Sequence, residues 1–81
     1  MSMEDEILRV IAQHGDNYAV GLMEMLKVGQ SIYGTLWSLE RRGLLDTYTR
    51  DEGMPERGGR PRWYYRLTDK ARARLRAEAL T

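Results

Sequence analysis

The chain has 81 residues, 42% of them hydrophobic and 31% charged, with no cysteine and a formal net charge of +1. A chain of this length buries only about 60% of its unfolded surface, so we expect one domain spanning residues 1–81. The composition excludes disulfides and thiolate chemistry, and no segment approaches the roughly 18 consecutive apolar residues of a membrane span.

Two helices are predicted before residue 27. The segment 2–15 has Ser2 as its N-cap, acidic residues in the first turn, where the helix dipole favours them, and Gly15 at its end. The segment 16–26 predicts a second, shorter helix, which is followed by a turn at 27–30. Because the acidic start has no basic segment, we expect no signal peptide, and the absence of cysteine fits a cytoplasmic protein.

Residues 30–43 predict a third helix, closed by Gly43. Its apolar side carries Ile32, Leu36 and Leu39. The opposite arc is polar, small and free of acids, and it holds Gln30, Ser31, Gly34, Ser38 and Arg41. We expect the rings of Tyr33 and Trp37 to pack at the edge of the core rather than to stack on bases.

A hairpin and a last helix complete the chain. Residues 44–50 and 62–68 alternate as strands do, and the intervening loop is rich in glycine, proline and charge. On the second strand we expect one face to enter the core (Trp63, Tyr65 and Leu67). The other face carries Arg62, Tyr64 and Arg66, and Tyr64 could reach DNA or pack on the neighbouring strand. Thr68 then caps a final helix over residues 69–80.

Three helices, a two-stranded hairpin and a C-terminal helix describe a mainly helical α+β fold, the winged helix-turn-helix. In this fold the third helix would lie in the major groove of DNA and the hairpin loop would be the wing. Charge fits this interpretation: residues 1–40 carry six acidic and two basic side chains, whereas residues 41–81 carry eleven basic and six acidic ones. The C-terminal half is therefore a candidate for binding a polyanion, although uneven charge alone does not establish it.

The candidate DNA-binding residues fall into two groups. On the third helix, Gln30 and Ser31 could bond base edges or phosphates, Gly34 and Ser38 leave room for close approach, and Arg41 would meet phosphates. Tyr33 lies among them. On the wing, Gly59 lets the backbone come close to DNA, while the guanidinium groups would meet phosphates or enter the minor groove (Arg57, Arg60 and Arg62).

Two segments resemble the PadR family of bacterial transcriptional regulators. "GQSIYGTLWSLERRGLLD" is similar to its third helix, and "GGRPRWYYRLTDKARARL" is similar to its wing and following helix. The helical segment would also fit other winged-helix families, such as MarR. The resemblance implies a dimeric repressor or activator of a palindromic operator; we expect a repressor. Gly34 stands where proline is common in that family. The chain stops at Thr81, before the long helix through which the family usually dimerises. For that reason we infer no effector ligand from the resemblance.

Other functions are less well supported by the residues. One histidine and no cysteine exclude the usual zinc sites and cysteine nucleophiles, so we expect no enzyme activity, no metal and no cofactor. The Arg-Gly-Gly segment could be a solvated hairpin tip or could bind RNA, but its strand flanks favour an ordered hairpin. The main alternative is an adaptor or anti-repressor that binds a protein partner. The regulator interpretation predicts a homodimer on double-stranded DNA in the cytoplasm, associated with the nucleoid, of prokaryotic, phage or plasmid origin.

Overall fold

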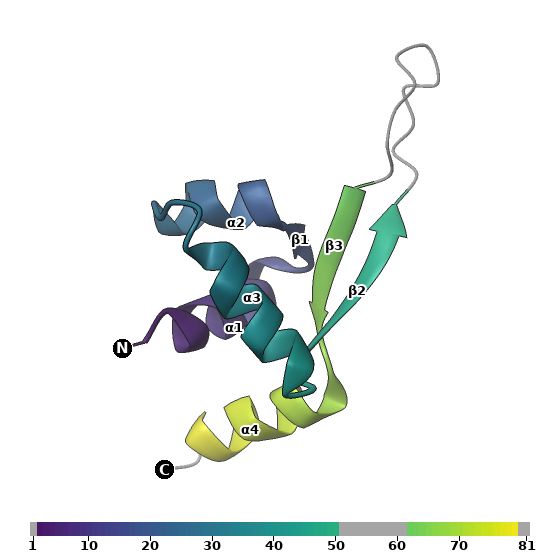
Figure 1. Ribbon diagram of the computed structural model, residues 1–81. Coiled ribbons are helices and arrows are strands. Elements are labelled where there is room, and N and C mark those ends of the chain that lie inside the picture. The colour runs from purple at the N-terminus through teal and green to yellow at the C-terminus, as the bar shows by residue number, and fades with distance from the viewer. Residues whose placement is uncertain (1, 51–61, 80–81) are drawn as a thin grey trace.

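The computed structural model describes residues 2–50 and 62–79. Its elements follow in the order α1 (Met3–His14), β1 (Asn17–Tyr18), α2 (Ala19–Leu26), α3 (Ile32–Arg41), β2 (Leu45–Arg50), β3 (Arg62–Leu67) and α4 (Asp69–Ala79). The predicted winged helix-turn-helix is confirmed: the helices gather at one end, and the β2–β3 hairpin projects away from them (Figure 1).

The helix boundaries follow from the local chemistry that the sequence displays. The Asp5 N–H donates to the Ser2 hydroxyl at the start of α1, and Gly15 ends that helix with a φ of 95°. At the end of α3, Gly43 takes a φ of 75°, in the left-handed region that glycine adopts without strain, and the Leu44 N–H donates to the Leu39 carbonyl (2.9 Å). Both predicted ends are therefore confirmed.

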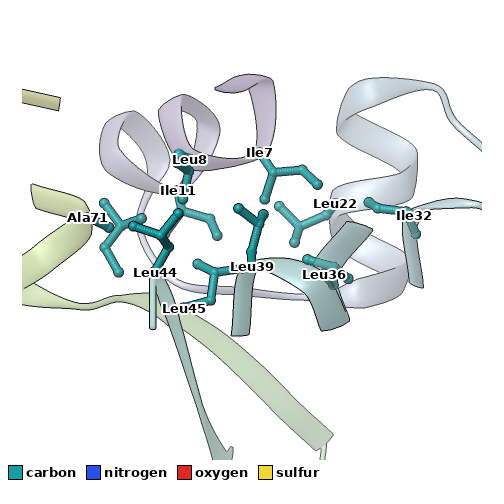
Figure 2. Close-up of a cluster of buried hydrophobic side chains, with 11 residues drawn as sticks. Ile7, Leu8, Ile11, Leu22, Ile32, Leu36, Leu39, Leu44, Leu45 and Ala71 are labelled. Atoms are coloured by element: carbon teal, nitrogen blue, oxygen red, sulfur yellow. The ribbon is translucent and has the colours of Figure 1, made fainter. Parts of the chain in front are cut away.

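One core joins all the helices to the base of the hairpin. The buried apolar side chains come from every helix and from both hairpin strands, and ten of them are labelled in Figure 2: Ile7, Leu8, Ile11, Leu22, Ile32, Leu36, Leu39, Leu44, Leu45 and Ala71. These positions recur at helical spacing in the sequence, so the periodicity of the apolar residues defines the core.

The sheet has a third strand that the sequence did not suggest. Asn17 and Tyr18 were expected at the start of the second helix, but they are extended and pair with β3, so the strand order is β1-β3-β2. The Asn17 side-chain oxygen accepts a hydrogen bond from the Tyr18 N–H (2.8 Å). Sheet pairing and this local bond hold the backbone extended, and α2 therefore begins only at Ala19.

The C-terminal helix is tied to the end of α3 by polar contacts. Thr68 caps α4 as predicted, accepting from the Ala71 N–H (3.2 Å), and its own hydroxyl donates to the Gly43 carbonyl (2.6 Å). The Lys70 ammonium donates to the Arg42 carbonyl (2.9 Å). These bonds, with buried Ala71, fix α4 against the turn that links α3 to the hairpin.

Candidate nucleic-acid interface

The outward face of α3 presents two large aromatic rings. Tyr33 is 48% exposed and Trp37 is 60% exposed, and the Arg41 guanidinium lies 4.6 Å from the centre of the Trp37 ring. Gly34 shares this face, where an added Cβ would meet open space. The expectation that these rings pack at the edge of the core is therefore wrong for Trp37, which is mostly exposed. Tyr33 is about half exposed and lines a groove beside Tyr65, which packs against the core.

The other predicted residues of this group lie to either side of that face. Gln30 and Ser31 are exposed, but they precede α3 in the turn that enters it, where the Tyr33 N–H donates to the Gln30 carbonyl (3.1 Å). Ser31 occupies the N-cap position without a side-chain capping bond. Ser38 is half-buried, so it leaves less of its side chain available than predicted. The structure thus groups Tyr33, Gly34, Trp37 and Arg41 most closely.

The loop end of the hairpin strands carries a pair of exposed arginines. Arg50 on β2 and Arg62 on β3 are opposite each other in the strand register. Each guanidinium lies on a tyrosine ring, Arg50 at 4.3 Å from the centre of Tyr64 and Arg62 at 4.6 Å from that of Tyr18. Sequence reasoning missed Arg50, although the hairpin register would have paired it with Arg62. Arg57, Gly59 and Arg60 lie outside the described residues.

Three tyrosines lie side by side across the three strands. Tyr18 pairs with Tyr64, and Tyr64 pairs with Tyr48; the adjacent ring centres are 5.6 Å and 5.9 Å apart. This explains why Tyr64 is only 5% exposed although it is on the face away from the helical core. Of the two roles considered for Tyr64, the structure shows packing on the neighbouring strand. The row stiffens the sheet where the hairpin leaves the helices.

A hydrogen-bonded chain links this row to the turn after α1. The Tyr48 hydroxyl donates to the Asp16 carboxylate (2.6 Å) and accepts from the Arg50 guanidinium (3.0 Å). The bond to Asp16 is the main reason that the pKa of Tyr48 is raised above its ordinary value. Arg50 is thereby held in place by a side chain that is itself fixed to the helical part of the molecule.

The predicted burial of Trp63 is wrong. This residue was expected in the core with Tyr65 and Leu67, yet its side chain is 60% exposed. Tyr65 and Leu67 do pack against the core, so the assignment of faces was right. Trp63 is the second residue of β3 and lies nearer the hairpin loop than Tyr65 and Leu67. A groove of about 630 Å³ runs beside it, lined by Tyr18, Ala19, Val20, Glu24, Tyr33, Arg62, Trp63 and Tyr65.

Among the residues that the structure describes, no three His, Cys, Asp or Glu side chains gather where they could hold a metal ion. Within residues 2–50 and 62–79, none of the helices combines the length and the apolar character needed to cross a membrane.

Comparison with known proteins places the chain among regulators of transcription. The family model "Transcriptional regulator PadR-like family" matches residues 7–77. The solved structure of transcriptional regulator PA4135 is similar with a TM-score of 0.78 and 21% identity, over 94% of this chain and 52% of that one. A second, smu.1704 from Streptococcus mutans UA159, gives a TM-score of 0.75 and 33% identity, over 94% of this chain and 71% of that one. This chain thus spans about half the length of PA4135. No curated protein matches it.

Proposed function

This chain belongs to the PadR-like family of transcriptional regulators, and from that premise we propose that it represses transcription by binding a specific sequence of double-stranded DNA. In this proposal residues 1–81 form a single DNA-binding domain. α3 enters the major groove, and the hairpin lies along the backbone or in the minor groove. The observation that carries the proposal is the placement of the exposed face of α3 on the same molecule as a projecting hairpin whose strands carry Arg50 and Arg62 at their loop end.

The chemistry of the two elements suits the two parts of a duplex. Exposed arginines neutralise phosphates and release counterions, which gives affinity for any sequence. Side chains at the start of α3, including Gln30 and Ser31, could bond base edges and so select a sequence. The rings of Tyr33 and Trp37 offer apolar contact to thymine methyl groups in the same groove.

A homodimer on a palindromic site completes the proposal. Two copies would present their α3 helices about 34 Å apart, which is one turn of the duplex. A single winged helix binds one half-site weakly, so pairing would supply the affinity and the two-fold symmetry of the operator. Measuring the mass of the free protein and of its complex with a duplex, by sedimentation, tests this step.

Charge-matched variants test the role of the hairpin. Arg62→Gln should weaken binding to every duplex. It should also reduce the steepness of the plot of log affinity against log salt concentration by about one, because one fewer phosphate is neutralised. Arg66→Gln is the control, because Arg66 is exposed on the same strand but about 13 Å further from the hairpin tip and is paired with Asp46 (3.4 Å). If both substitutions change binding equally, net charge rather than the hairpin is responsible.

The alternative function is a protein-binding adaptor or anti-repressor, and one observation favours it. Trp37 and Trp63 are both 60% exposed, and exposed tryptophans are frequent at the centres of protein interfaces. A stable protein partner that co-purifies with the chain, together with no salt-sensitive binding to duplex DNA, would select this function over the first.

A further inference from the structure

The groove beside Trp63 lies between the two elements proposed to bind DNA. Tyr33 of α3 forms part of one wall, and Trp63 and Arg62 of β3 form part of another. The groove lies at the edge of the sheet formed by β1, beside β3. It is lined by Trp63 and Tyr65 and also by Tyr18, the member of the tyrosine row on β1, over whose ring the Arg62 guanidinium lies. It therefore extends from Tyr33 on the exposed face of α3 to Arg62 at the loop end of the hairpin strands.

Large side chains that line the groove are exposed to solvent. Trp63 is 60% exposed and Tyr33 and Val20 are each 48% exposed, although a chain this small has little apolar surface to spare for its core. Clustered exposed aromatics mark surfaces that become covered by a partner. The polar edges of these rings are neutral hydrogen-bond donors, the Trp63 indole N–H and the Tyr33 and Tyr65 hydroxyls. Burial raises the pKa of Tyr65.

The geometry of a duplex indicates what would fill the groove. One sugar–phosphate strand separates each major groove from the neighbouring minor groove. A protein that places a helix in one and a hairpin in the other must hold that strand between them. We infer that this groove seats the sugar–phosphate strand, with the Trp63 and Tyr33 donors bonded to phosphate oxygens and the ring faces packed on deoxyribose. This inference rests on the proposed function, and it names residues that bind the DNA backbone through uncharged hydrogen-bond donors.

One group in the groove opposes a phosphate. The Glu24 carboxylate also lines it, and it would repel a phosphate within a Debye length, about 8 Å at physiological salt. Arg62 lines the same groove and attracts one. The strand should therefore lie toward the Arg62 side. Removing the Glu24 charge with Glu24→Gln should raise affinity for every duplex, and the gain should shrink as salt is added.

The test uses a random-sequence duplex and variants that keep a ring at each position. Trp63→Phe and Tyr33→Phe each remove one neutral donor, and each should lower affinity about tenfold, the usual effect of losing a bond to a charged acceptor. Neither change should alter the salt dependence, because a neutral donor releases no counterion. Gln13→Ala is the control: it removes an exposed neutral donor from α1, outside the elements proposed to bind DNA, so nonspecific affinity should change less than about twofold.

A second readout locates the contact directly. In the Trp37→Phe variant Trp63 is the remaining tryptophan of the chain, so its fluorescence reports on the groove alone. We expect added duplex to protect Trp63 from quenching by acrylamide. Thermal melting of each variant checks that the fold is retained, as expected for substitutions at exposed positions.

The outcomes separate the inference from the proposed function. If the wild-type protein binds duplex DNA with strong salt dependence, but Trp63→Phe and Tyr33→Phe bind as tightly and Trp63 stays open to acrylamide, then the groove does not hold the backbone and only this inference fails. If the wild-type protein binds no duplex, the proposed function fails and the inference falls with it.

Discussion

Replacing Gly34 by alanine should have opposite effects on stability and on DNA binding. Gly34 is the third residue of α3, its φ is not positive, and an added Cβ would meet nothing within 4 Å. Alanine loses less backbone entropy than glycine when a helix forms, which is worth roughly 0.5–1 kcal/mol. For a domain of this size that free energy corresponds to a rise in Tm of about 2–8 °C.

The same methyl group would project from the face of α3 that is proposed to enter the major groove. If DNA approaches Gly34 closely, the added group forces a shift in the complex that costs about 1–3 kcal/mol, or at least about fivefold in affinity. Thermal unfolding followed by circular dichroism gives the stability, and fluorescence anisotropy with a labelled duplex gives the affinity. The variant should be more stable and bind less tightly.

Gly21→Ala is the matched control in another helix. Gly21 is buried in α2, and a Cβ there would overlap the side-chain amide of Asn17. That amide accepts from the Tyr18 N–H and would have to move, so Gly21→Ala should destabilise the fold. A fall in stability for Gly34→Ala would refute the open space seen at that position. Unchanged DNA affinity would refute the close approach of DNA to this part of α3.

Further predictions concern the core, the first cap and the tyrosine row. Leu39→Ala, at a position with no exposure, should destabilise the fold by about 2–5 kcal/mol, measured by denaturant unfolding. Ser2→Ala should cost about 1 kcal/mol in the same assay, because the Asp5 N–H loses its acceptor; no change would mean that the cap is not formed in solution. The pKa of Tyr48 is higher in the folded state, so its contribution to stability is present below the ordinary tyrosine pKa of about 10 and is lost as pH rises through the folded pKa. Unfolding between about pH 8 and pH 11 should therefore show a steeper loss of stability for the wild type than for Tyr48→Phe, and equal slopes would contradict the Asp16 bond.

Local patterns in the sequence predict most of this fold. The apolar residues of the first and third helices recur every three or four positions, and the structure buries those same side chains. Capping by Ser2 and Thr68 and closure by Gly15 and Gly43 depend on neighbouring residues only, and these predictions are confirmed.

The errors occur where distant segments meet. Strand β1 exists because Asn17 and Tyr18 pair with β3, a contact between segments almost fifty residues apart that no local pattern reveals. Trp63 alternates correctly with Tyr65 and Leu67, but alternation assigns a face of the strand and does not show how far along the strand the core extends.

Binding of the purified protein to a labelled random-sequence duplex, at about 50 mM and about 200 mM salt, tests the central claim most directly. A dimer that neutralises roughly 6–10 phosphates should lose on the order of 10³–10⁵ in affinity between the two conditions. That result would support a DNA-binding regulator with the hairpin arginines on the backbone. An absence of binding at the lower salt concentration would contradict it and would direct the search to a protein partner for the exposed tryptophans.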